Sequence, residues 1–260
     1  MSINISNQYI PCDTKNLLPR KIEQNEFKNY NFALIYRLPN IFIEKGQIKI
    51  RINEKIEKFN WDREFIKNLT KRLERSIQGV KELGYEVKKI DNLTLSWRMV
   101  IGLGASHPQE TSMTLHHIYG IPYIPGCAVK GVTRHWVILT KFENDEKKAE
   151  QDNDFQKIFG TQEKQGEVIF FDAYPVDEIK LKLDIMNPHY PKYYSGEQPP
   201  ADWQTPVPIY FLTVEKTKFN FYLASRDKNL LNNAEKYLKE ALKSYGIGAK
   251  TSLGYGIFEG

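Results

Sequence analysis

The sequence has few cysteines, no long apolar run and no strong excess of charge of one sign. Cys12 and Cys127 are its two cysteines, too few for a disulfide framework, and they favour a reducing compartment. No apolar run approaches the roughly 18 residues of a membrane span, and the N-terminus lacks the apolar core of a signal peptide. These features predict a soluble, cytoplasmic protein with no membrane partner.

The net charge is weakly positive. Lys and Arg number 37 against 32 Asp and Glu, which gives +5 and a pI near 8.9. This lies just below the pI of about 9 that indicates nucleic-acid binding by itself. The charge therefore permits an RNA partner without requiring one. With 260 residues, 41% of them hydrophobic, the chain is long enough for one large core with insertions.

From Leu93 onward the hydrophobic periodicity switches between strand-like and helix-like segments. Strands are predicted over 93–101, 167–173, 209–214, 219–224 and 255–258, and helices from Ala128 and over 227–245. Read coarsely, with the two adjacent strands of 209–224 counted as one, the order is the β-α-β-β-α-β of the ferredoxin-like fold of RNA-recognition domains. The predicted fold class is α+β, with a ferredoxin-like (RRM-like) core over residues 93–260.

Two segments are predicted to elaborate this core. Residues 1–92 form an N-terminal helical extension packed on it, in which apolar residues recur every four positions from Trp61 to Ile77. The cations on the other faces of that helix are interpreted as a solvated surface. Residues 184–208 carry six prolines, which exclude a helix or a central strand. They form a proline-rich insertion between the second and third strands of the core.

The C-terminal segment 245–259 is the most informative part of the chain. It contains four glycines around a cation and two hydroxyls: Gly246, Gly248, Gly254 and Gly256, with Lys250, Thr251 and Ser252. Neither a P-loop nor a dinucleotide fingerprint fits this spacing. A helix C-cap and a turn explain the first glycines, but glycine inside a strand indicates a bulge or the close approach of another backbone. The pattern predicts that the loop grips a polyanion through its backbone.

A second candidate site lies in the segment 124–134, where a predicted helix follows Pro125 and Gly126. Helix N-termini attract anions. Lys130 and Arg134 are four residues apart and share one face, where like charges repel unless an anion lies between them. The pair is interpreted either as a phosphate clamp or as two solvated cations.

The two motifs together resemble the RAMP superfamily of CRISPR-associated RNA-binding proteins. They read Ile124-Pro-Gly-x-x-x-Lys-Gly-x-x-Arg134 and Gly246-Ile-Gly-x-Lys-Thr-x-x-Gly-Tyr-Gly256. The segment 184–203, with Asn187-Pro-His-Tyr190, is similar to the sixth Cmr subunits of type III-B effector complexes. Cys127 and Ala128 depart from the pattern, because many relatives have two serines there.

The resemblance implies a non-catalytic RNA-binding subunit that contacts guide RNA near its 3′ end. Its partners would be CRISPR guide RNA, target RNA and other RAMP subunits of a Cmr complex acting in antiviral defence. The candidate RNA-binding residues are Gly126, Lys130, Arg134, Gly246, Gly248, Lys250, Thr251, Ser252, Gly254, Tyr255 and His107. No cofactor is expected.

The histidines suggest an enzymatic alternative. His107, His116 and His117 share a loop with Cys127 nearby, but their spacing does not match a zinc site, so no metal is expected. His107 fits a general base in a metal-independent endoribonuclease that processes CRISPR repeat RNA. No second acid or base accompanies it in the sequence.

The proline-rich insertion leaves a further alternative open. It is rich in aromatic residues: Tyr190, Tyr193, Tyr194 and Trp203. These side chains fit stacking on RNA bases and equally a contact with a neighbouring subunit. A protein that serves assembly only, whose basic motifs contact acidic partners, is a third possibility.

Overall fold

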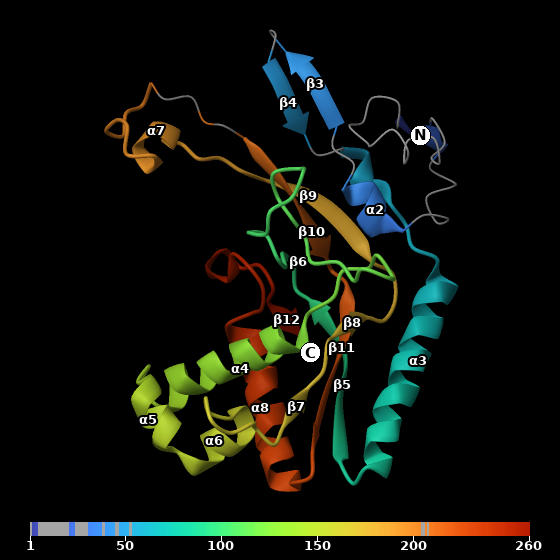
Figure 1. The fold of residues 1–260 in the computed structure, drawn as a ribbon, viewed down its shortest axis with the longest axis vertical. Coiled ribbons are helices and arrows are strands. Elements are labelled where there is room, and N and C mark those ends of the chain that lie inside the picture. Colours follow the sequence, from blue (N-terminus) through green and yellow to red (C-terminus); the bar gives the residue numbers. More distant parts are fainter. Residues whose placement is uncertain are drawn as a thin grey trace. The chain divides into compact units, whose positions relative to one another are not determined.

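The computed structural model describes residues 2–4, 21–23, 31–37, 40–44, 47–51, 54–203, 206 and 208–260. The helices are α2 (Phe32–Tyr36), α3 (Arg63–Glu82), α4 (Gly126–Lys141), α5 (Glu146–Gln151), α6 (Asn153–Phe159), α7 (Pro191–Tyr194) and α8 (Lys228–Ser244), with short 3-10 helices η2 (Glu54–Lys58) and η3 (Thr251–Leu253). The strands are β1 (Ser2–Asn4), β2 (Lys21–Glu23), β3 (Asn40–Glu44), β4 (Gln47–Arg51), β5 (Glu86–Leu95), β6 (Arg98–Met99), β7 (Ile169–Phe170), β8 (Tyr174–Pro175), β9 (Lys180–Met186), β10 (Ile209–Glu215), β11 (Lys218–Ser225) and β12 (Phe258–Glu259). Figure 1 shows these elements along the chain.

The chain forms two compact units from interleaved segments. The first comprises residues 1–60, 102–121 and 181–213, and the second comprises 61–101, 122–180 and 214–260. Both predicted RNA-binding motifs lie in the second unit, whereas His107 lies in the first.

An antiparallel sheet forms the centre of the second unit. Its strands lie in the order β12-β5-β11-β7, and β8 also pairs with β11. The long central pair runs from Lys218 opposite Thr94 to Ser225 opposite Glu86. This pairing places β5 and β11 in the middle of the sheet, with the two-residue strand β12 at its edge.

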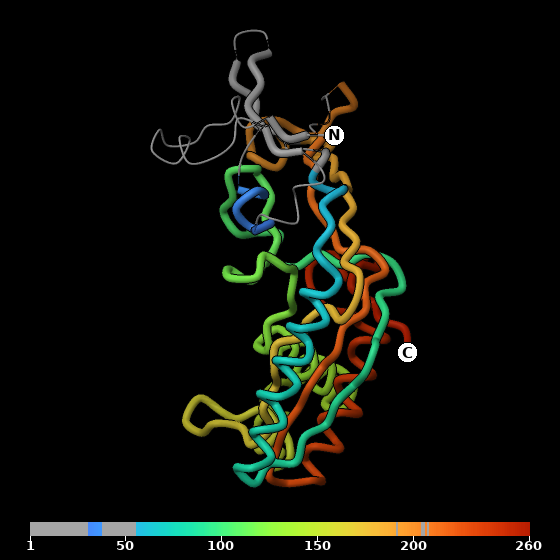
Figure 2. The backbone as a smooth tube through the Cα atoms, turned by 90° about the vertical axis from the view of Figure 1, so that its right-hand side faces the viewer, coloured from blue at the N-terminus to red at the C-terminus, as the bar shows by residue number. Residues whose placement is uncertain are grey.

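Helices cover both faces of this sheet. Phe219 and Phe221 of β11 point to the face where their rings meet Phe258 edge-on, and α8 packs on this side of the central strands. Asn220 and Tyr222 point to the other face, because successive side chains of a strand alternate. There the Tyr222 hydroxyl donates to Glu74 of α3 at 3.1 Å. Figure 2 shows α3 running alongside the strands.

The predicted strand over 93–101 differs from the structure. β5 begins at Glu86, so the expected boundary between residues 92 and 93 falls inside a strand. The charged residues of its first half obscured the pattern, although Lys88 and Lys89 are paired with Glu235 and Glu74. Asn92 has a positive φ of 52° at a β-bulge, where the pairing shifts between Phe219 and Phe221.

The insertion contains a strand that the sequence did not predict. Residues 180–186 form β9, which pairs with β10, and the Thr213 hydroxyl donates to the carbonyl of Lys182 at 2.7 Å. All six prolines follow Met186. The described residues between Met186 and β10 contain no strand, but Pro191–Tyr194 forms the short helix α7, which the prolines were predicted to exclude. No helix within the described residues is long and apolar enough to cross a membrane.

Candidate nucleic-acid interface

The terminal loop, residues 245–257, is fixed to the second unit by backbone hydrogen bonds. Ile247 donates to Gly256 at 3.0 Å, which closes the loop, and Ala249 donates to Val100 at 2.8 Å. Gly256 donates to Arg98 at 2.7 Å. The loop therefore has a defined shape before any ligand binds, as a backbone grip on a polyanion requires.

Most of the loop glycines have an internal reason for being glycine. All four have positive φ, between 72° and 101°. A Cβ at Gly248 would overlap the carbonyl oxygen of Val100, and one at Gly256 would overlap that of Ile247. The close approach predicted from the sequence is present, but the approaching group belongs to the protein. Among the four, only Gly254 has open space where a Cβ would lie, with no neighbouring atom within 4 Å.

The outer side of the loop carries the groups suited to phosphate. Lys250 is half-buried at φ 61°, Thr251 is half-buried, and Ser252 and Gly254 are exposed. Tyr255, also predicted to bind RNA, has a buried side chain whose ring packs against Trp97 at 4.8 Å. Its side chain therefore anchors the loop.

The N-terminus of α4 already holds an anion. The backbone N–H of Gly126 donates to Oδ1 of Asp172 at 2.6 Å, and a Cβ at Gly126 would overlap the carbonyl oxygen of Phe170. Asp172 thus occupies the place where the sequence predicted an RNA phosphate. The sequence analysis could not predict this hydrogen bond, because residues 126 and 172 meet only through tertiary packing and no local pattern indicates that contact.

Arg134 is also held by interactions within the protein. Its guanidinium pairs with Glu146 at 2.8 Å and Glu150 at 3.3 Å, and it lies over the Phe155 ring at 5.2 Å. These carboxylates of α5 relieve the repulsion for which the sequence analysis invoked a phosphate. Lys130 is half-exposed, and within the described residues no carboxylate pairs with it.

The helix that carries Lys130, α4, packs against α8, which leads into the terminal loop. His135 of α4 contacts Tyr245 at the end of α8, and Lys141 lies 4.2 Å from the Tyr237 ring. Both contacts join the second half of α4 to the second half of α8 or to the residue that follows it, and Figure 1 shows the two helices crossing. Lys130 thus lies on a helix that packs against the end of α8, where the loop with Lys250, Thr251, Ser252 and Gly254 begins.

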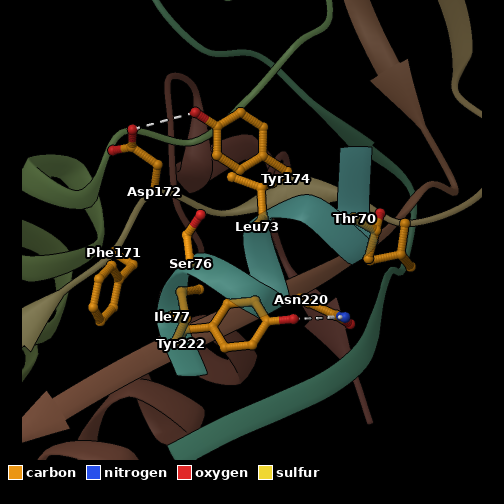
Figure 3. A pocket seen from close by; sticks show the side chains of 10 residues that line it. Thr70, Leu73, Ser76, Ile77, Phe171, Asp172, Tyr174, Asn220 and Tyr222 are labelled. Carbon is orange, nitrogen blue, oxygen red and sulfur yellow. Dashed lines mark hydrogen bonds between the residues drawn. The ribbon is translucent and has the colours of Figure 1, made fainter. Parts of the chain in front are cut away.

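A cavity of about 200 Å³ lies between α3 and the sheet. Figure 3 shows Leu73 and Ile77 of α3 facing Tyr222 and Phe171, with Asp172 and Tyr174 on one side. Its main polar groups are already paired: Asn220 accepts from the N–H of Asn92 and donates to Tyr222, and Asp172 accepts from Gly126. An apolar cavity with occupied polar groups does not suit a phosphate backbone. We therefore place the candidate interface at the terminal loop.

His107 lies in the first unit, stacked on Tyr36 with ring centroids 4.4 Å apart. Its Nδ1 accepts the N–H of Gln109 at 3.2 Å. Burial, and secondarily the charge of Arg37, lower the pKa of His107 below its usual value. The imidazole is thus neutral near pH 7, with its proton on Nε2 and its basic nitrogen, Nδ1, already accepting from Gln109. To act as a general base, His107 would first have to release this hydrogen bond.

This lowered pKa predicts a loss of stability in acid. Because the unfolded histidine binds a proton at a higher pH than the folded one, the free energy of unfolding falls as pH drops through about 6.5. His107→Gln removes this contribution. We expect its melting temperature to fall less than that of the parent between about pH 7 and pH 5. Equal pH dependence in thermal melts of both proteins would contradict this assignment.

The aromatic residues of the insertion are open to solvent. Tyr193, Tyr194 and Trp203 are exposed, and the Tyr190 hydroxyl donates to Asp202 at 3.5 Å. Both predicted roles of these side chains, stacking on RNA bases and contact with a neighbouring subunit, stay predictions. Across the described residues, no group of three or more His, Cys, Asp or Glu side chains has an arrangement that could hold a metal ion.

The second unit is of the α+β class, with antiparallel strands, two packed helices and a glycine-rich terminal loop. The model of the RAMP superfamily matches residues 93–259, more than half of the chain, and the chain belongs to this superfamily.

Two relatives show which members of the superfamily this chain is similar to. The CRISPR system Cmr subunit Cmr6 of Pyrococcus furiosus is 41% identical over 217 residues, covering 61% of this chain and 64% of that protein. The Cmr6 of Saccharolobus solfataricus is 28% identical over 185 residues, covering 69% and 60%. The chain thus spans less than two thirds of these relatives.

Among solved structures, a chain of the type III-B Cmr-beta complex bound to cognate target RNA has a similar fold. Its TM-score is 0.62 at 27% identity, and the match covers 78% of this chain and 66% of that one.

Proposed function

We propose that the chain is a non-catalytic RNA-binding subunit of a type III-B CRISPR (Cmr) ribonucleoprotein complex in the cytoplasm. Its partners would be guide RNA near the 3′ end, target RNA and other RAMP subunits. Superfamily membership and the likeness to Cmr6 support this proposal, as does the similarity in fold to a chain of the Cmr-beta complex bound to target RNA. The observation that carries it is the preformed loop that contains Lys250, Thr251 and Ser252, and Lys130 of the neighbouring helix α4 is its candidate partner in binding.

The proposal includes a fold assignment. The order β5-α4-β7/β8-β11-α8-β12 corresponds to β-α-β-β-α-β, with the first and third strands central in the sheet. We assign these elements as a ferredoxin-like core. β9, the proline-rich segment and β10 would then be an insertion between β8 and β11. In contrast to an RNA-recognition domain that stacks bases on an open sheet, α3 covers the sheet here, which favours the terminal loop as the RNA contact.

The loop and Lys130 are tested together. Replacing Lys130 and Lys250 with alanine should weaken binding to a labelled single-stranded RNA similarly for every sequence, because phosphate contacts do not read bases. The slope of log K against log salt should fall by about 1.4, or about 0.7 per contact. Fluorescence anisotropy over a salt series measures this slope.

The matched control replaces Lys88 and Lys180 with alanine, which removes the same charge from lysines paired with Glu235 and Glu178. An equal change in both double variants would show a general charge effect and would count against the proposed interface. If the parent does not bind RNA at all, a role in assembly only replaces the proposal.

The second candidate is a metal-independent endoribonuclease, because the lowered pKa of His107 keeps its imidazole unprotonated. Incubation of the full chain with CRISPR repeat RNA in a chelator decides between the two. Cleavage that His107→Ala abolishes would replace the non-catalytic proposal, and intact RNA would support it.

A further inference from the structure

The outer side of α3 carries a row of cations that the proposed interface does not use. Lys67, Lys71 and Arg75 are all exposed and follow one another at intervals of four residues. At 1.5 Å per residue the row is about 12 Å long. Neighbours at this spacing face each other on the helix surface, so the three like charges repel.

Several cations of the second unit are neutralised by ion pairs within it. Lys88, Arg98, Arg134, Lys180 and Lys239 each pair with a glutamate. For Lys67, Lys71 and Arg75, the part of the chain that the structure describes provides no carboxylate partner. The row therefore keeps its full positive charge.

The acids of the same helix do not cancel this charge. Glu74 lies beside the row, but Lys89 binds it at 2.7 Å and the Tyr222 hydroxyl donates to it. Glu64 lies in the first turn of α3 and Glu82 in its last. The middle of the helix is thus positive on this side.

A groove of about 590 Å³ borders the row between α3 and β5. Residues of α3 line one side of it: Lys71, Glu74, Arg75, Gln78, Gly79, Lys81 and Glu82. Val87, Lys89 and Tyr222 line the side formed by the sheet. Because Lys89 holds Glu74, the cations Lys71, Arg75 and Lys81 outnumber the remaining acid, and this excess of positive charge favours an extended polyanion.

We propose that the α3 row and its groove bind the phosphate backbone of a single RNA strand. This second contact rests on the proposed function and extends it to a different element of the same unit. Cations without base-reading groups position a strand but carry no sequence information, so binding here is independent of RNA sequence. The solvated-surface interpretation of these cations is replaced, since a bound strand would supply the missing counter-charge.

The test uses the full chain and a labelled oligouridine in anisotropy titrations over a salt series. A triple variant changes Lys67, Lys71 and Arg75 to Gln, which has a similar helix propensity and keeps α3 intact. The salt slope should fall by about 2, that is about 0.7 for each of up to three contacts. The matched control changes Lys88, Lys148 and Lys180 to Gln, all in ion pairs.

A slope equal to that of the control triple would overturn the α3 contact, and the row would then serve an acidic protein partner. This outcome is separate from failure of the proposed function. In the first case the Lys130/Lys250 variant still lowers RNA affinity, whereas in the second the parent itself does not bind. A lower slope for the α3 triple alone supports the inference.

Discussion

Replacing Gly248 with valine is expected to destabilise the second unit strongly. The residue has φ 101°, where a β-branched side chain is strained, and its Cβ would overlap the carbonyl oxygen of Val100. The strain and the overlap together should remove about 3 kcal/mol or more of the free energy of unfolding. Urea denaturation followed by circular dichroism measures the loss.

Gly254→Val is the matched control for this substitution. Gly254 also has a positive φ, 89°, but open space surrounds the position of its Cβ. It should lose only about 1–2 kcal/mol from backbone strain and still melt cooperatively. If Gly254 lies under bound RNA, this folded variant should bind RNA more weakly than Lys250→Ala does. Equal stability of the two valine variants would contradict the internal role of Gly248.

The loop glycines show which features of the site could be predicted from the sequence and which could not. A spacing of glycines indicates positive φ and a close approach, and both are present at Gly248 and Gly256. The identity of the approaching backbone depends on which strand lies beside the loop. Val100 lies far from Gly248 in the sequence, so local pattern could not identify it.

Elements with strong periodicity were predicted closely. The apolar stripe of residues 227–245 gave α8, observed over Lys228–Ser244, and β10 and β11 match the predicted strands within one residue. β5 and β9 were missed in part because their charged side chains are neutralised by tertiary ion pairs. Lys182 of β9, for example, pairs with Glu57 at 3.4 Å.

Side-chain roles in the candidate site were harder to predict than the elements that carry them. Lys130 and Arg134 are equivalent in sequence terms, yet Arg134 is held by Glu146 and Glu150. Asp172 reaches Gly126 from another element. Which cation remains available for a ligand is decided by the acids that folding brings near it, and spacing along one helix does not contain that information.

Replacing Phe258 with alanine should produce a second large effect. Phe258 is 1% exposed, and its ring meets Phe221 at 5.4 Å and Phe219 at 6.0 Å. Removing a buried phenylalanine typically costs about 3–5 kcal/mol, because the cavity left behind does not fully collapse. The same loss is expected here in urea denaturation.

The position of Phe258 gives this variant a functional consequence. β12 pairs with β5 only through Phe258 and Glu259, so the Phe258 ring holds the C-terminal end of the terminal loop. We expect Phe258→Ala to lower RNA affinity as well, even at temperatures where most of the protein is folded. Glu259→Ala is the matched control, since its exposed side chain should contribute within about 0.5 kcal/mol. A loss below about 1 kcal/mol in Phe258→Ala would mean that the backbone hydrogen bonds of the loop to Arg98 and Val100 hold its shape without the aromatic cluster.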